Sequence, residues 1–87
     1  MNKFHLRVTS VVRTLFSEQV ESVFLSGDEG EYELLPHHYP LMGALPEGEI
    51  KIAGFDPIPL KGGIVVFLNN QCTIIMEEFQ TETFMAS

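Results

Sequence analysis

The chain has 87 residues, 45% of them hydrophobic, and its 12 acidic against 5 basic side chains give a formal charge of −7. This length suffices for one domain with a modest core, and the negative charge disfavours nucleic acid and anionic lipid as partners. No apolar run reaches the ~18 residues of a membrane span, and the start MNKFHLRVTS lacks the continuous apolar segment of a signal peptide. The single cysteine, Cys72, predicts no internal disulfide. Together these features predict a soluble cytoplasmic protein.

The N-terminal half alternates apolar and polar residues, which is typical of half-buried strands. Such a strand is predicted where Phe4, Leu6 and Val8 alternate with Lys3, His5 and Arg7. Residues 11–16 and 20–25, both rich in Val and Phe, predict two further strands. The turn sequence SGDEG at 26–30 then precedes a short strand predicted at 31–35.

Turn residues divide the second half of the chain into further short strands. Ile50 and Ile52 alternate with charged residues after the turn sequence PEG. Residues 54–59 contain two prolines and predict a loop or an irregular edge strand. Residues 64–68 read IVVFL and are apolar on both faces, so this strand needs cover from a second sheet on one side and from a loop or a partner on the other.

A hairpin is predicted to close the sheet. Residues 69–70 read NN, which suits a two-residue turn because asparagine tolerates positive φ. The returning strand places Cys72, Ile74 and Met76 on one face. Residues 77–87 show no period and predict a poorly ordered tail. About eight short strands without a convincing helix favour an all-β sandwich or barrel.

The histidine pair at His37 and His38 is a candidate metal site. Adjacent strand residues point to opposite faces, and no spacing in the sequence resembles a zinc motif. We therefore expect no metal site. Instead, one histidine is predicted to pack against Tyr39 or a backbone carbonyl, and the other to meet solvent or a partner.

The acids Asp28, Glu29, Glu31 and Glu33 are a candidate catalytic or binding cluster. No nucleophile motif or phosphate-binding loop accompanies them, so the sequence does not predict an enzyme. The cluster is interpreted as a solvated hairpin tip or as an acidic rim that meets a basic partner. The methionines at positions 42, 76 and 85 are predicted to fill the core.

Three motifs, in this order, resemble the epsilon subunit of rotary F-type ATP synthases. They are FSxxVESVFLSGDEGE at 16–31, LLPHHYPLMGALPEGEIKI at 34–52 and KGGI at 61–64. The resemblance extends over residues 4–76, and its most specific part is the combination of GxEGE, LPxHxP and the later Gly-Gly at similar spacing.

The resemblance implies a β-sandwich of about ten strands in two sheets over residues 1–78, followed by a short acidic and polar tail at 79–87. In the family, this non-catalytic domain lies at the foot of the central stalk. It clasps the gamma subunit, rests on the polar loops of the membrane c-ring and couples rotation to the catalytic head in proton- or sodium-driven ATP synthesis. The implied location is the cytoplasmic face of the energy-transducing membrane, most often the bacterial inner membrane, as a peripheral subunit without membrane insertion or cofactor. The isolated subunit is expected to be a monomer.

The resemblance also assigns contact residues. The turn at Glu29, Gly30 and Glu31 matches the loop that faces the c-ring, and Glu31 is the main candidate because the facing loops typically carry an arginine. The positions that match the gamma border are Ser10, His38, Met42 and Gly43.

Two positions depart from the family pattern, since Glu33 and His37 stand where glycine is usual. A left-handed conformation at either would cost about 1 kcal/mol.

The 54–59 connection is also shorter than the usual hairpin. Family members commonly continue into two helices that bind ATP or inhibit the head. A subunit ending at 87 residues is expected to couple rotation without them. The alternative hypothesis is a free-standing small β-barrel that binds a ligand or a protein.

Overall fold

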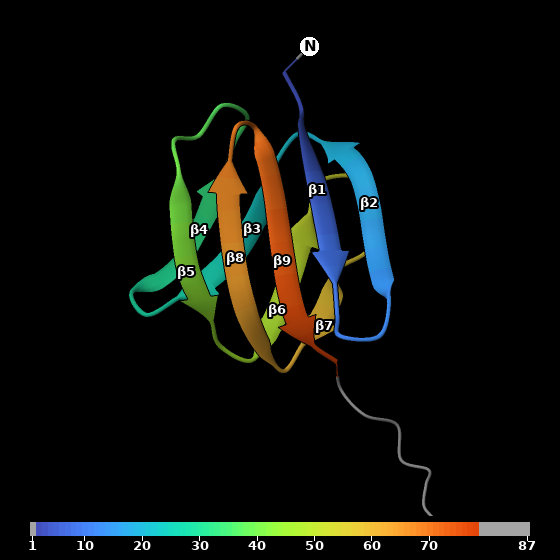
Figure 1. Cartoon of the computed structure of the whole chain (residues 1–87). Helices are drawn as coiled ribbons and strands as arrows, with labels where there is room; N and C mark the ends of the chain where they lie inside the picture. The colour runs from blue at the N-terminus through green and yellow to red at the C-terminus, as the bar shows by residue number, and fades with distance from the viewer. Residues whose placement is uncertain (1, 79–87) are drawn as a thin grey trace, which may run out of the picture.

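The computed structural model describes residues 2–78, which form a sandwich of two stacked β-sheets (Figure 1). One sheet has five strands in the order β2–β1–β9–β8–β5, and the other has four in the order β4–β3–β6–β7. The strands are β1 (Phe4–Thr9), β2 (Thr14–Val20), β3 (Val23–Gly27), β4 (Gly30–Leu34), β5 (Leu41–Leu45), β6 (Gly48–Ile52), β7 (Ile58–Leu60), β8 (Gly62–Leu68) and β9 (Gln71–Glu77). The predicted all-β sandwich is confirmed, with nine strands in the described part where the resemblance implies ten.

The core lies between the two sheets and follows from the alternation in the sequence. Each strand turns every second side chain inward, and the rings of Phe4 and Phe67 meet at 5.3 Å between centroids. Cys72, Ile74 and Met76 share one face of β9, as predicted, and this face is buried in the core. The buried residues are Phe4, Leu6, Val8, Val20, Val23, Leu25, Leu34, Leu45, Ile50, Ile52, Leu60, Val65, Phe67, Cys72, Ile74 and Met76.

The strand predicted at 11–16 is wrong in its start, since only residues 14–16 belong to a strand. The chain turns at this point because the Ser10 N–H donates to the Arg13 carbonyl at 2.8 Å, and β2 begins only at Thr14. Val11 and Val12 therefore lie on the turn, 93% and 77% exposed. β-branched residues favour strands only where a neighbouring strand can pack against them, and none does here.

The strand predicted at 20–25 is also wrong in its boundaries. β2 ends at Val20 and β3 begins at Val23, because the chain passes from the five-stranded to the four-stranded sheet between them. The connection is held by Ser22, whose carbonyl accepts a hydrogen bond from the Ala53 N–H at 3.2 Å. The predicted stretch thus spans parts of two strands that belong to different sheets.

The predicted turn chemistry is largely confirmed. Asn69 and Asn70 adopt φ of 53° and 59° in the β8–β9 turn. The 54–59 segment leads into β7, a three-residue edge strand paired with β6. The tail predicted at 79–87 lies outside the described residues, whereas Glu77 is the last residue of β9. Residues 2–78 contain no helix long and apolar enough to cross a membrane.

Candidate interaction surfaces

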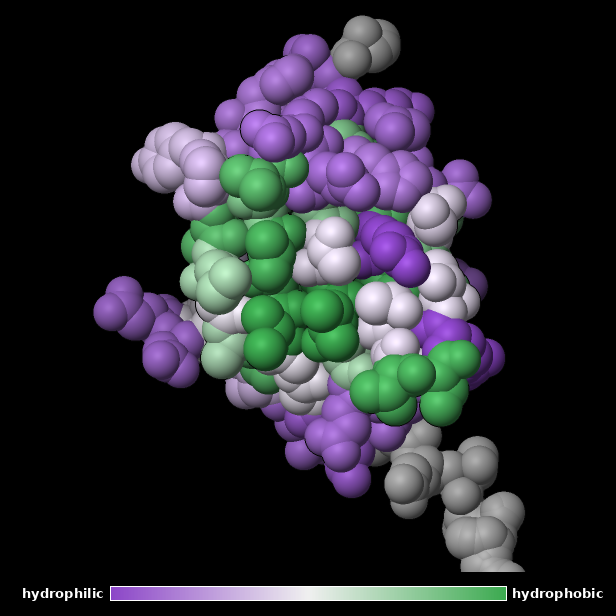
Figure 2. All heavy atoms as spheres, in the orientation of Figure 1, coloured by the Kyte–Doolittle hydropathy of each residue, from purple (hydrophilic) through white to green (hydrophobic). Residues whose placement is uncertain are grey.

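The outer face of the five-stranded sheet carries a continuous group of apolar side chains on β5, β8 and β9 (Figure 2). This outer apolar face consists of Met42, Ala44, Ile64, Val66, Leu68 and Ile75. Met42 is 74% exposed, and Ile64 and Ile75, which lie directly opposite each other, are each 48% exposed. Contiguous apolar surface of this kind on a small protein marks an interaction site.

The predicted cover is therefore present on only one side of β8, the strand that is apolar on both faces. Val65 and Phe67 of β8 are fully buried against the second sheet. On the other side, Leu68 is 51% exposed, and no segment within residues 2–78 lies over it. The prediction that Met42 fills the core is wrong, because β5 is an edge strand that turns this side chain outward.

A hollow of about 610 Å³ lies at one end of this face, between the β1–β2 turn and the ends of β8 and β9. Its lining is mostly apolar, with Val11, Ile64 and Ile75 beside the backbone of Gly63. Gly63 has to be glycine, because a Cβ at this position would collide with the Ile75 carbonyl oxygen on β9. Without that side chain, β8 and β9 approach closely under the hollow.

Ser10 borders the hollow and belongs to a polar cluster with Arg13 and Glu78. The Ser10 hydroxyl donates to Glu78 Oε2 at 2.9 Å, and the Arg13 guanidinium donates to both carboxylate oxygens, at 2.7 and 3.2 Å. Hydrogen bonds from Arg13 and Ser10 hold the pKa of Glu78 below its ordinary value. The cluster ties the β1–β2 turn to the residue that follows β9. Spacing gives no signal for it, since 65 residues separate Arg13 from Glu78.

His38 lies at the opposite end of the sheet. Its ring packs on Tyr39 and Phe67, with centroids 5.0 and 5.6 Å away, and its Nδ1 donates to the Tyr39 carbonyl at 2.6 Å. His37 is exposed and adopts φ of 67°. The predicted division of roles between the two histidines is therefore confirmed. Of the two family departures, His37 is left-handed and Glu33 is an ordinary strand residue of β4.

Asn70 fixes the path of the chain past His37. Its Oδ1 accepts the His37 N–H at 2.6 Å, and its Nδ2 donates to the Lys3 carbonyl at 3.0 Å. One side chain thereby joins the β8–β9 turn, the β4–β5 loop and the start of β1. Sequence reasoning recognised Asn70 only as a turn residue, because these contacts come from segments far apart in the chain.

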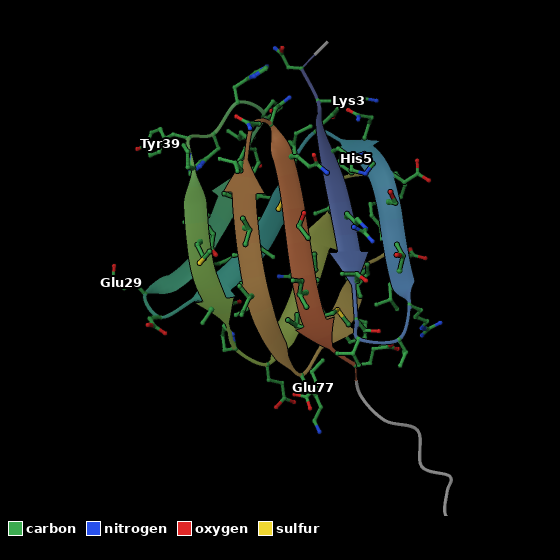
Figure 3. The ribbon with its side chains drawn as sticks, in the orientation of Figure 1. Lys3, His5, Glu29, Tyr39 and Glu77 are labelled. Carbon is green, nitrogen blue, oxygen red and sulfur yellow. The ribbon has the colours of Figure 1, made fainter. Side chains whose placement is uncertain are left out.

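The acidic turn belongs to the four-stranded sheet and projects beyond the side of the sandwich on which β5 lies (Figure 1). Glu29 lies at the tip of the β3–β4 hairpin and points away from the sandwich (Figure 3). Glu31, on β4, forms a salt bridge of 3.2 Å with Lys51 of β6, and both side chains are about half exposed. Lys51 was not predicted as a site residue from the sequence. Strand β3 pairs with both β4 and β6, and this pairing brings the two charges together.

The predicted site residues therefore fall into two separate regions. Ser10 and His38 lie at opposite ends of the five-stranded sheet, since one adjoins the end of β9 and the other contacts Phe67 near the end of β8. Met42 and Gly43 lie between these ends on β5, although Gly43 faces inward, where a Cβ would lie 3.9 Å from Val65 Cγ1. The acidic turn belongs to the other sheet.

The described residues hold no cluster of three or more metal-ligating side chains. Cys72 is fully buried, and burial raises the pKa of its thiol to about 12, so it stays protonated and unreactive near neutral pH. The geometry of these surfaces suits contact with other molecules.

Comparison with known proteins gives a consistent result. The family model for the ATP synthase delta/epsilon chain β-sandwich domain matches residues 3–82. The chloroplastic ATP synthase epsilon chain of Zygnema circumcarinatum is 34% identical over 77 residues, which cover 85% of this chain and 58% of the relative. The ATP synthase epsilon chain of Hyphomonas neptunium is 33% identical over 81 residues, with 88% and 60% covered. The chain spans about 60% or less of the length of these relatives.

The fold agrees with these matches. A chain in the structure of the Euglena gracilis mitochondrial ATP synthase OSCP/F1/c-ring superposes with a TM-score of 0.77 at 21% identity, covering 85% of this chain and 50% of that one. A chain in the central stalk and c-ring structure of the Tetrahymena thermophila mitochondrial ATP synthase gives a TM-score of 0.74 at 14% identity, covering 85% and 63%. The chain therefore belongs to the ATP synthase delta/epsilon family and contains its β-sandwich domain.

Proposed function

We propose that this chain is the epsilon subunit of the central stalk of a rotary F-type ATP synthase. In this role it catalyses no reaction. It clasps the gamma subunit and couples c-ring rotation to the catalytic head as a peripheral subunit on the cytoplasmic face of the membrane. The single observation that carries the proposal is the outer apolar face, which leaves a sheet of a family member uncovered within the described residues.

Two separate surfaces support a coupling role. The outer apolar face offers non-directional contact area for gamma, with Ser10, His38, Met42 and Gly43 along or beside it. The acidic turn at Glu29–Glu31 offers charge to the basic loops of the c-ring from the other sheet. A stiff sandwich between the two surfaces transmits torque, because its layers share one packed core.

The gamma contact is tested by making the outer apolar face polar without adding charge. We expect the Ile64→Gln/Ile75→Gln double variant to bind purified gamma at least about tenfold more weakly, since it loses two half-exposed side chains that would be buried in the complex. The matched control is Phe24→Gln, which makes a similar change on the outer face of the four-stranded sheet. Isothermal calorimetry gives the affinities, and equal weakening by control and double variant would contradict the assignment.

The c-ring contact is tested through the salt bridge. If Glu31 meets a basic loop, Lys51 competes for the same carboxylate. We expect Glu31→Gln to weaken binding to purified c-ring a few-fold and Lys51→Gln to strengthen it, because exposed ion pairs contribute up to about 1 kcal/mol. Glu49→Gln, another exposed acid of the same sheet, is the control. Unchanged binding in both Glu31 and Lys51 variants would remove Glu31 from the contact.

The hollow beside Ser10 favours the second candidate, a free-standing β-barrel module that binds a ligand. The two functions are distinguished by the same purified chain. Stalk function requires a one-to-one complex with gamma in gel filtration at micromolar concentration. A ligand module instead gives no complex with gamma and retains a small molecule in native mass spectrometry.

A further inference from the structure

The strand β5 forms an open edge that differs from the other edges of the sandwich. It pairs with β8 and with no other strand in residues 2–78. Of the other edge strands, β2 carries Glu18, β4 carries Glu31 and Glu33, and β7 is three residues long with Pro59 at its centre. Charges, prolines and short length are the devices by which edges avoid pairing with other chains. β5 reads LMGAL and has neither a charge nor a proline.

The direction of the backbone groups on β5 follows from the neighbouring hairpin. Asn69 and Asn70 both have positive φ, which defines a two-residue type I′ turn. In such a hairpin the flanking residues, Leu68 and Gln71, exchange both of their hydrogen bonds. Antiparallel strands alternate between bonded and non-bonded pairs, so Val66 also directs its N–H and C=O toward β9.

The alternation continues across to β5. Val65 directs its backbone groups the other way, toward β5, where its partner is Gly43. Gly43 therefore bonds to β8, and its neighbours Met42 and Ala44 direct their N–H and C=O groups away from the sheet. Their side chains are also exposed, as part of the outer apolar face.

Two prolines delimit this open ladder. Pro40 and Pro46 lie two residues beyond Met42 and Ala44, respectively, in the same alternation along the chain. Both prolines lack the N–H that an added strand would need. The edge thus offers the backbone N–H and C=O groups of only two residues to an added strand. These residues also belong to the outer apolar face. An occupant needs an extended backbone to satisfy the ladder and apolar side chains to cover Met42.

We propose that β5 accepts an extended apolar segment of the gamma subunit as an added strand, hydrogen-bonded to Met42 and Ala44. The inference rests on the proposed function and deepens it, because it states how gamma engages the sheet. A second copy of this chain is disfavoured as the occupant. Each copy carries a formal charge of −7, so two copies repel each other.

The main test is a matched pair of variants at one position. Ala44→Pro removes an outward N–H, and Ala44→Val keeps it while adding a side chain of similar size. We expect both chains to retain thermal stability and Ala44→Pro to bind gamma about tenfold more weakly than Ala44→Val, the effect of one missing interfacial hydrogen bond. Equal affinity of the two variants overturns the inference and leaves the proposed function intact, whereas absence of gamma binding by the unmodified chain overturns both.

Hydrogen exchange on the unmodified chain gives an independent readout if Ala44→Pro folds poorly. We expect the amides of Met42 and Ala44 to exchange rapidly in the isolated chain and to gain at least about tenfold protection in the gamma complex. The Gly43 amide, bonded to β8, is the internal control and is expected to be protected in both states. Rapid exchange of Met42 and Ala44 in the complex overturns the inference. Protection in the isolated chain, together with a dimer in sedimentation, assigns the edge to a second copy and also overturns it.

Discussion

The two sheets of the sandwich are alike inside and different outside. Both inner faces supply buried apolar side chains, because both must close one core, although the fully buried rings of Phe4 and Phe67 belong to the five-stranded sheet. Outside, the five-stranded sheet presents the outer apolar face, whereas the four-stranded sheet presents acids and the Glu31–Lys51 pair. Folding requires only the inner faces to be apolar. Folding alone therefore does not explain why the outer faces of the two sheets differ.

The largest expected effect comes from truncating a side chain on the inner face of β8, compared with one on its outer face. Phe67→Ala should lower the free energy of unfolding by about 3–5 kcal/mol, because it leaves a cavity in the core. Ile64→Ala, on the outer face of the same β8, should lower it by less than about 1 kcal/mol. Urea unfolding followed by circular dichroism measures both. Comparable losses of stability would mean that the outer face also contributes to folding, which contradicts the proposed difference between the two faces.

A pair of glycines sharpens the comparison within the five-stranded sheet. Gly63→Ala should destabilise the chain by about 1–3 kcal/mol, because its Cβ meets the rigid backbone of Ile75. Gly43→Ala should be close to neutral, since its Cβ reaches only ordinary contact distance from Val65. Thermal unfolding of the two variants tests this order. A tolerated Gly63→Ala would show that β8 and β9 can separate under the hollow.

Substitutions of Asn70 test how much its hydrogen bonds between distant segments contribute to stability. Asn70→Ala should cost about 1–2 kcal/mol, because it removes two hydrogen bonds and places alanine at positive φ. Asn70→Gly loses the same hydrogen bonds without the strain and should cost less. Denaturant midpoints separate the two contributions. Equal losses would show that only the hydrogen bonds matter.

The smallest effect concerns the polar cluster at the end of β9. Hydrogen bonds from Arg13 and Ser10 lower the pKa of Glu78 from 4.5, so the stability they contribute is present above that pH. It is lost as pH falls through the lowered pKa. The difference in melting temperature between the unmodified chain and Glu78→Gln should therefore shrink in acid. Glu77→Gln, whose carboxylate forms no salt bridge among the described residues, is the matched control for the loss of one surface charge.

Much of the fold could be predicted from local patterns in the sequence. Alternation identified β1 and β9, and the residues NN identified the turn between β8 and β9. Local patterns failed at Val11 and Val12, because β-branched residues were read as a strand that lacks a neighbour to pack on. The family resemblance supplied candidate contact residues, which periodicity alone could not identify.

The rest of the candidate surfaces depends on contacts between distant segments. Lys51 reaches Glu31 only through the pairing of three strands, and Glu78 reaches Arg13 across nearly the whole chain. The open edge at β5 likewise requires the strand order, which one sequence does not contain. Sequence alone therefore recognised which residues are unusual and left open which of them lie together.

The parallel pairing of β1 with β9 also has a consequence for synthesis of the protein. β1 is made first and β9 last among the described strands, yet they are neighbours inside the five-stranded sheet. A nascent chain that has not yet reached β9 has β1 and β2 on one side of the five-stranded sheet and β8 and β5 on the other, without the strand that lies between them. The ribosome must therefore release almost the whole domain before it can fold, which exposes its apolar segments to chaperones until then.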